Sequence, residues 1–203
     1  MMALRFCVLA LVTFLALVAL VSPAPGEPYH QHLPKTERRQ VRIPINDFTL
    51  SDQNAKSFEW KNLSGKVVLV SFSYTSCSDV CPLITAAARQ VQSSLSAAER
   101  DSVYLLTVTT DPEIDSPKVL GAYAKRYGAE FANWSFLTGR ETELNKIWKN
   151  FGVRVKRKGR GIVEHTPLTA IVDQKSQMRF VYIGPSPDPK LVLTDVRALL
   201  AQR

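Results

Sequence analysis

The sequence predicts a three-layer α/β domain in which a central mixed sheet is flanked by helices, preceded by an N-terminal β-hairpin. Apolar runs at residues 67–72 and 103–109 are continuous rather than alternating, which is typical of strands buried on both faces of a sheet. Segments with helical periodicity follow each run, and such alternation indicates layered α/β architecture. A strand hairpin and a helix are predicted to close the domain.

Two residues with restricted or special backbone conformations help to define the helices. Pro82 suits a first helical turn, where a missing N–H leaves no hydrogen bond unmade. Gly128 suits the position just after a helix. In chain order we expect a hairpin of 48–50 and 57–60, a strand at 67–72, a helix at 82–95, a strand at 103–109, a helix at 117–127, a strand at 135–137, a helix at 141–151, a hairpin of 167–172 and 178–183, and a helix at 190–200.

The first 24 residues differ from the rest of the chain. Arg5 precedes an uncharged apolar run from Phe6 to Val21, shorter than the ~20 residues that comfortably span a bilayer. We interpret residues 1–24 as a signal peptide or membrane anchor. Residues 25–40, rich in proline and polar groups, are predicted to be a flexible tether, and 41–203 one folded domain. The folded domain would then be periplasmic or otherwise extracytoplasmic.

The chain is basic, with a formal net charge of +8. A dense basic stretch contributes to this charge, and we interpret it as a solvated hairpin tip: Arg154, Lys156, Arg157, Lys158 and Arg160. The alternatives are docking to an acidic partner or to an anionic membrane surface. Nucleic acid is not an expected partner, because the chain carries an export signal and the stretch has no interleaved aromatic residues.

Cys77 and Cys81 are the centre of the predicted chemistry. They lie where a buried strand leads into a helix, and the positive end of a helix lowers the pKa of a nearby thiol. A disulfide across so short a loop would constrain the unfolded chain little, which disfavours a purely structural role. At positions i and i+4, the thiols can share one side once helical geometry begins. They could then close a disulfide or bind a soft ion such as Cu(I).

His165 is the candidate third ligand. The chain has three histidines, and the other two lie in the predicted tether. In a thioredoxin-like topology, the loop containing His165 lies beside the dithiol. An imidazole added to two thiolates makes a site that also suits Cu(II).

Three segments resemble the signature of the Sco/SenC family: residues 71–82 (SFSYTSCSDVCP), 108–117 (VTTDPEIDSP) and 162–166 (IVEHT). Together the resemblance covers roughly residues 45–200. It implies a thioredoxin-like fold and a copper-binding metallochaperone delivering copper to cytochrome c oxidase. The implied partner is the copper-site subunit of that oxidase or another copper-acceptor protein, with membrane association through the N-terminal segment.

By position, the resemblance implies that Cys77, Cys81 and His165 bind copper as Cu(I) or Cu(II). Asp111 matches the family's Asp-Pro motif and is either a supporting group near this site or an ordinary turn former.

Two residues depart from the family pattern, in which an apolar or small residue is common at Pro167 and proline is frequent at Ser78. A proline at the start of this strand is instead the pattern of thioredoxins, where it is cis and packs against the dithiol. The alternative function is therefore a thiol:disulfide oxidoreductase in which Cys77 and Cys81 reduce acceptor cysteines before metallation. An interaction module with a local disulfide fits less well, because it leaves the Cys-x-x-x-Cys spacing at a strand–helix junction unexplained. A thiol peroxidase also fits less well, because no arginine matching a peroxide pocket accompanies Thr75.

Overall fold

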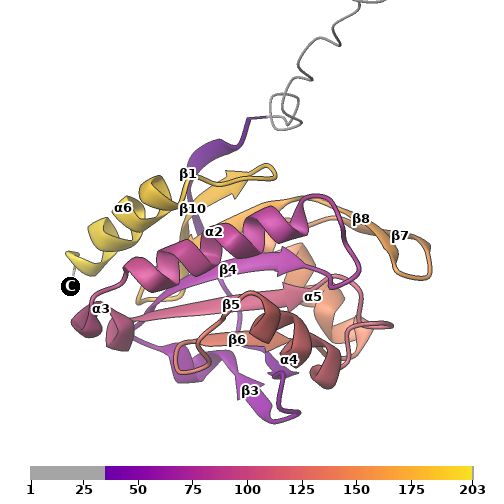
Figure 1. Cartoon of the computed structure of the whole chain (residues 1–203). Coiled ribbons are helices and arrows are strands. Elements are labelled where there is room, and N and C mark those ends of the chain that lie inside the picture. Colours follow the sequence, from indigo (N-terminus) through magenta and orange to yellow (C-terminus); the bar gives the residue numbers. More distant parts are fainter. Residues whose placement is uncertain (1–34, 203) are drawn as a thin grey trace, which may run out of the picture. The chain divides into compact units, whose positions relative to one another are not determined.

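The structure, a computed structural model, describes residues 35–202 and contains a six-stranded mixed sheet (Figure 1). In spatial order the strands are β1 (Glu37–Pro44), β10 (Gln177–Ile183), β9 (Leu168–Val172), β4 (Val67–Ser73), β5 (Val103–Thr109) and β6 (Trp134–Leu137). Strands β4, β5 and β6 are parallel, and the remaining pairings are antiparallel. The predicted mixed sheet and thioredoxin-like fold are confirmed.

Helices cover both faces of this sheet, which makes the three predicted layers. The helices are α2 (Cys81–Ser94), α3 (Ala97–Ser102), α4 (Pro117–Arg126), α5 (Glu141–Phe151) and α6 (Pro189–Leu200). One face packs against α2, α4 and α6. The other packs against α5, the hairpin of β2 (Thr49–Ser51) and β3 (Ser57–Glu59), and the 3-10 helix η2 (Trp60–Leu63).

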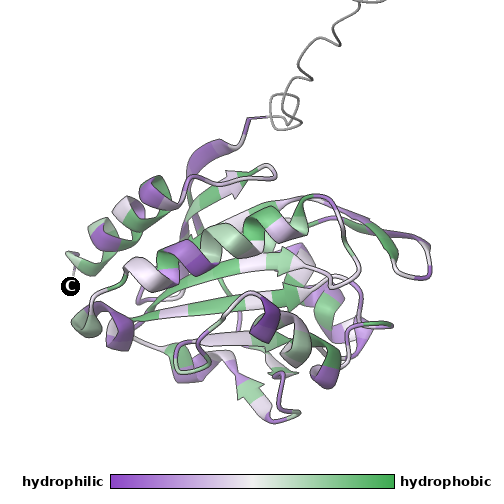
Figure 2. Ribbon diagram, viewed as in Figure 1, coloured by the Kyte–Doolittle hydropathy of each residue, from purple (hydrophilic) through white to green (hydrophobic). Residues whose placement is uncertain are grey.

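Strand β4 is buried on both faces of the sheet, which explains its continuously apolar sequence. Val68, Val70 and Phe72 belong to the core on the α5 side, whereas Val67 and Leu69 belong to the core on the α2 side. Successive side chains of a strand point to opposite faces, so a strand buried on both faces needs apolar residues throughout. Figure 2 shows the resulting hydrophobic colour along β4 and β5.

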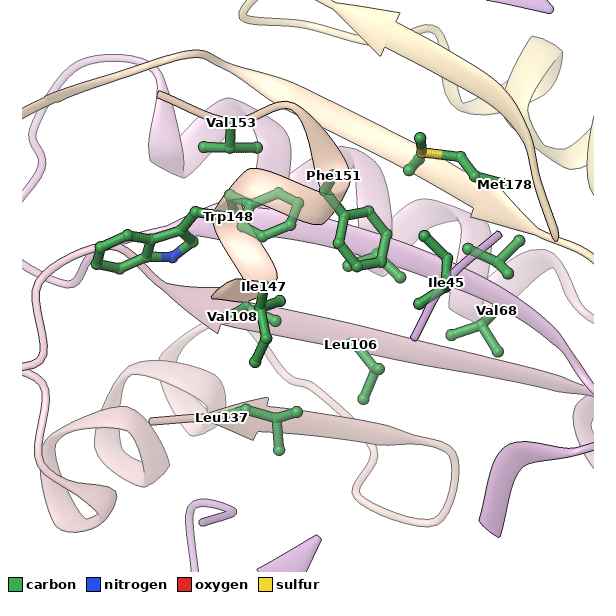
Figure 3. Close-up of a cluster of buried hydrophobic side chains, with 14 of the residues drawn as sticks. Ile45, Val68, Leu106, Val108, Leu137, Ile147, Trp148, Phe151, Val153 and Met178 are labelled. Carbon is green, nitrogen blue, oxygen red and sulfur yellow. The ribbon is translucent and has the colours of Figure 1, made fainter. Parts of the chain in front are cut away.

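Helix α5 presents its apolar stripe to the sheet. Ile147, Trp148 and Phe151 pack in the same core as Leu106 and Val108 of β5 (Figure 3). The helix begins at Glu141 and ends at Phe151, as predicted, and Gly152 follows it in the left-handed conformation that favours glycine. This packing supports β4, which leads directly into the cysteine loop.

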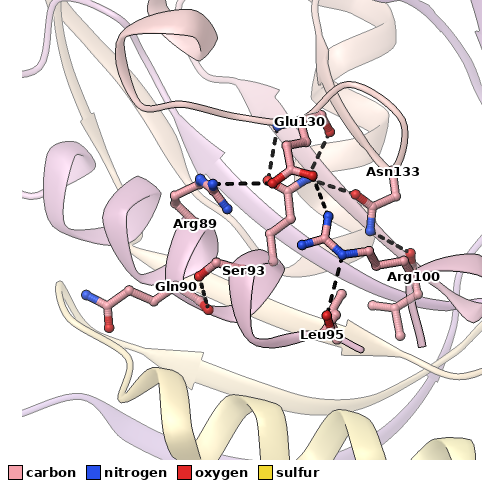
Figure 4. A network of polar contacts seen from close by, with 9 residues as sticks. Arg89, Gln90, Ser93, Leu95, Arg100, Glu130 and Asn133 are labelled. Carbon is pink, nitrogen blue, oxygen red and sulfur yellow. Dashed lines mark hydrogen bonds and ion pairs between the residues drawn. The ribbon is translucent and has the colours of Figure 1, made fainter. Parts of the chain in front are cut away.

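A polar network that includes the buried side chains of Gln92 and Asn133 anchors the end of α2 that is remote from the cysteines (Figure 4). The Gln92 side chain donates to the Glu130 carbonyl and to Asn133 Oδ1, both at 2.8 Å, and accepts from the Glu130 N–H. Arg89 and Arg100 pair with the Glu130 carboxylate. Because buried polar groups are costly unless satisfied, this network fixes the position of α2 and therefore of its first residue.

Strand β1 begins inside the range 25–40 that the sequence predicts to be a flexible tether. It starts at Glu37, which pairs with Ile183 of β10, so residues 37–40 belong to the sheet. β1 is an edge strand with many charged residues, a composition that protects sheet edges but hides the apolar signal of a strand. The predicted leader and the start of the predicted tether lie outside the described residues. Within residues 35–202, no helix combines the length and apolar character needed to cross a bilayer.

The basic stretch forms a hairpin, in agreement with its interpretation as a hairpin tip. Its strands are β7 (Val155–Gly159) and β8 (Ile162–His165), which pair with each other as a separate two-stranded sheet. Helix α3 was not expected, although Ser96 and Glu99 form a complete capping box at its start.

Candidate functional site

The two cysteines lie at the junction of β4 and α2. Cys81 is the first residue of α2 and is 0% exposed, whereas Cys77 lies in the preceding loop and is half-buried. Both are free thiols. A turn with a 3.3 Å hydrogen bond from the Cys77 N–H to the Tyr74 carbonyl brings Cys77 back toward the helix. Loop geometry, rather than the expected helical i to i+4 spacing, therefore brings the thiols together.

The thiols differ in proton affinity. A hydrogen bond from the Cys81 thiol lowers the pKa of Cys77 against the opposing effect of burial, and the N–H groups of Cys81 and Asp79 lower it further. The same thiol–thiol contact, together with burial, raises the pKa of Cys81. Cys77 is therefore the thiolate of the pair and Cys81 the protonated donor.

His165 is the last residue of β8 and reaches the buried thiol. Its Nδ1 lies 3.0 Å from the Thr166 carbonyl, and its Nε2 lies 3.7 Å from Cys81 Sγ. A carbonyl only accepts, so Nδ1 carries the proton and Nε2 presents its lone pair toward the thiols. Burial lowers the pKa of His165, which favours the neutral ring. This is the protonation state in which an imidazole binds a metal ion.

Tyr74 contacts both His165 and Cys77, and the sequence did not predict it as a site residue. Its ring packs edge-to-face on the His165 imidazole, with centroids 5.8 Å apart and planes at 78°. Its hydroxyl also hydrogen-bonds Cys77, and burial followed by the charge of Cys77 raises the pKa of Tyr74 to about 12. The aromatic residue directly after β4 was the only sequence signal for this contact.

Asp111 is close to the hairpin rather than to the thiols. Its side chain is 0% exposed, and its Oδ1 lies 2.6 Å from an Arg157 guanidinium nitrogen. The cysteine loop instead contacts Asp115, which accepts hydrogen bonds from the Thr75 N–H and hydroxyl. Neither Asp115 nor Arg157 was predicted as a site residue, because each acts through a partner distant in sequence.

The described residues contain no cis peptide bond, so the bond before Pro167 is trans. The cis proline that thioredoxins place at this point is therefore absent here. The Pro167 carbonyl accepts a 2.9 Å hydrogen bond from the Gly184 N–H, which ties this segment to the end of β10.

The donor atoms suit a soft metal ion. Two thiols and a neutral imidazole are ligands that favour Cu(I) and, with the imidazole, accommodate Cu(II). Cys81 is in contact with both Cys77 and His165. In the part of the chain that the structure describes, no three His, Cys, Asp or Glu side chains are grouped closely enough to hold a metal ion as they stand.

Comparisons with known proteins place most of the described chain in one family. The SCO1/SenC family profile matches residues 36–201. The SCO1 protein homolog of Bacillus subtilis is 32% identical over 168 residues, covering 79% of this chain and 86% of that protein.

Two solved structures extend the comparison. The first is BsSco, described as a member of the Sco family of cytochrome c oxidase assembly proteins in which a disulfide switch was identified. It has a TM-score of 0.69 at 27% identity, covering 82% of this chain and 98% of that one. The second is Bradyrhizobium japonicum ScoI with copper bound, which has a TM-score of 0.65 at 28% identity, covering 77% and 99%.

Proposed function

Because the chain belongs to the SCO1/SenC family, we propose that it is a copper-binding metallochaperone for cytochrome c oxidase assembly that carries copper on Cys77, Cys81 and His165. The observation that carries this proposal is the contact between His165 and Cys81. The imidazole is neutral, and its Nε2 lone pair faces the thiol. Two similar structures support the proposal: BsSco is described as belonging to a family of cytochrome c oxidase assembly proteins, and Bradyrhizobium japonicum ScoI was solved with copper bound.

The two thiols would act at different stages of copper capture. Half-buried Cys77 is accessible and is the thiolate, so it is suited to receive the ion first. Cys81 would then release its proton to solvent as it becomes the second ligand, and His165 would offer Nε2 without a change of protonation. Delivery would follow the same order, with thiolates of an acceptor replacing Cys77, the more accessible ligand, before the buried ligands.

An anaerobic titration of the purified, reduced protein with Cu(I) and Cu(II) tests the proposal. We expect about one copper ion per chain, as for one Cys2His site. Replacing either cysteine by serine should abolish binding, and His165→Ala should weaken Cu(II) binding roughly tenfold or more. Glu164→Gln, which changes the exposed neighbour of His165, is the matched control and should bind as the parent does. A reduced protein that stays free of copper would contradict the proposal.

A second candidate function is a thiol:disulfide oxidoreductase that reduces acceptor cysteines before they receive copper. An accessible thiol of lowered pKa beside a buried thiol of raised pKa is the arrangement of an attacking and a resolving cysteine. Replacing Cys81 by serine should then trap a mixed disulfide between Cys77 and the acceptor. A trapped complex that forms equally well with His165→Ala favours the oxidoreductase, because thiol exchange needs no third ligand.

The proposed location is extracytoplasmic, in the periplasm or at the inner membrane through the N-terminal segment. The uncharged run from Phe6 to Val21 carries this proposal. The proposed partner is the copper-site subunit of cytochrome c oxidase or another copper-acceptor protein. Protease added to intact cells and to cells with a permeabilised outer envelope separates an exported domain from an internal one.

A further inference from the structure

We propose that residues 109–115, which are the last residue of β5 and the loop after it, form a frame that sets the spacing between the cysteine loop and the hairpin carrying His165. The positioning residues are Asp111 in the frame and Arg157 in the hairpin. The loop makes charged or hydrogen-bonded contacts with both halves of the site. In its copper-binding consequences this inference rests on the function proposed above, whereas its structural consequences do not.

The first contact joins the frame to the cysteine loop. Asp115 is 0% exposed and accepts hydrogen bonds from the Thr75 N–H at 3.2 Å and from the Thr75 hydroxyl at 2.5 Å. A further hydrogen bond comes from the Thr109 hydroxyl at 2.5 Å. Because Thr75 lies just before Cys77, this carboxylate holds the start of the cysteine loop against the end of β5.

The second contact joins the frame to the hairpin. Arg157 of β7 pairs with Asp111 at 2.6 Å and with Glu113 at 2.9 Å. Arg157 lies opposite Val163 in the hairpin register, and Val163 precedes His165 on the same strand. The pairing therefore acts on the segment that positions the imidazole.

Asp111 depends on this arginine. The carboxylate is fully buried, and its second oxygen has no hydrogen-bond partner among the described residues. A buried charge that loses its partner is strongly unfavourable. Displacing the hairpin would separate Arg157 from Asp111, so the buried carboxylate opposes that displacement.

The two contacts belong to one compact loop. The Asp115 N–H donates to the Asp111 carbonyl at 2.9 Å, and the Asp111 N–H donates to the Thr109 hydroxyl at 2.9 Å. The frame thus links the two carboxylates through its own backbone. A direct bond from the Ser76 hydroxyl to the Gly161 carbonyl, 3.2 Å long, also joins the cysteine loop to the hairpin turn.

Three variants isolate the role of Arg157. Arg157→Gln removes the charge, and Arg157→Lys keeps it. Arg179→Gln is the matched control, because Arg179 pairs with Asp173 at 2.9 Å and its side chain is 30% exposed, as is that of Arg157. Pro167 precedes β9 on the side of the site, whereas Asp173 follows the other end of this strand. The control therefore breaks a similar ion pair away from the site.

Hydrogen exchange of the hairpin amides, residues 155–165, tests the frame without metal. In Arg157→Gln we expect these amides to exchange at least about tenfold faster than in the parent, because the hairpin opens more often. Arg157→Lys should restore most of the protection, and Arg179→Gln should leave it unchanged. Equal exchange in Arg157→Gln and the parent, or equal acceleration in both glutamine variants, would overturn the inference.

Cu(II) binding tests whether Arg157 acts through His165. Arg157→Gln should weaken binding roughly tenfold, as loss of an orienting contact does. In the His165→Ala background the same substitution should cause no further loss. A full additional loss in that background would show that Arg157 does not act through the imidazole. If the parent binds no copper, the proposed function fails, while hydrogen exchange still decides whether the frame exists.

Discussion

Cys77 and Cys81 share a hydrogen bond and yet differ in proton affinity, which separates their chemical roles. The pKa of Cys77 is lowered and that of Cys81 is raised. A thiol with a lowered pKa stays reactive as the pH falls and loses reactivity only below its folded-state pKa. The stability that it contributes is complete above the ordinary thiol pKa of ~8.5 and is lost as the pH falls through the folded-state value.

We predict that Cys81→Ala raises the pKa of Cys77. The Cys81 thiol is the first of the groups that lower this pKa, and the Cys81 N–H would remain, so a partial return toward ~8.5 is expected. The rate of iodoacetamide alkylation of Cys77 as a function of pH, followed by mass spectrometry, measures the change. Tyr74→Phe, which removes a weaker donor, should give a smaller rise. Identical profiles for Cys81→Ala and the parent would contradict the prediction.

At the scale of single residues, the sequence identified the candidate ligands but not the residues that hold them in position. Cys77, Cys81 and His165 could be named because cysteine and histidine are few and carry distinctive chemistry. The structure places Cys81 beside both other residues, while their joint copper ligation remains a proposal. Arg157 could not be singled out, because in the sequence it is one of several neighbouring cations. Only the fold shows that it, unlike Arg154 or Arg160, faces a buried carboxylate.

Among the elements, α5 has a packing role that predicts a large mutational effect. Phe151 is 2% exposed and packs edge-to-face on Phe72 of β4, with centroids 5.3 Å apart, and on Trp60 at 6.5 Å. Truncating a buried aromatic side chain leaves a cavity that the surrounding core only partly fills.

We expect Phe151→Ala to lower the free energy of unfolding by about 3–5 kcal/mol. Urea denaturation followed by fluorescence and circular dichroism measures this value. Lys149→Ala, on the exposed side of the same helix, should change it by no more than about 0.5 kcal/mol. A loss below about 1 kcal/mol for Phe151→Ala would show that the core around α5 refills the space.

The predictability of each element followed its burial. Strands β4 and β5 were located from their continuous apolar runs, and α2 from its helical spacing of apolar residues. Strand β1 was not, because its side chains face solvent or form ion pairs and its pairing partner β10 lies far along the chain. Hydrophobic periodicity reports burial, so an edge strand rich in charge gives little signal.

At the scale of the whole molecule, β1 connects the N-terminal part of the domain to the C-terminal helix. Arg38 donates two hydrogen bonds to Asp195 of α6, at 2.6 and 2.7 Å, and lies 4.5 Å above the Phe180 ring of β10. Asp195 is 5% exposed. The fold therefore includes residues that its sequence pattern assigned to a tether.

We predict that a protein beginning at residue 41 is less stable than one beginning at residue 35 by about 3 kcal/mol or more, since Asp195 loses its charge partner. Arg38→Gln in the longer protein should reproduce most of this loss. Arg39→Gln is the matched control on the same strand, because Arg39 pairs with Glu37 in an exposed position and should cost less than about 1 kcal/mol. Equal stability of the two lengths in urea denaturation would contradict the prediction.

The contact between Cys81 and His165 has a consequence for the order of events in the life of the chain. The two residues are 84 positions apart, and they meet only when β9 has paired with β4 and the β7–β8 hairpin is in place. Contacts at such separation form late, because loop closure must precede them. A chain that crosses a membrane unfolded would therefore reach its compartment without the proposed copper site. Copper loading would then follow folding, and only a folded domain would compete for the ion with all three proposed ligands.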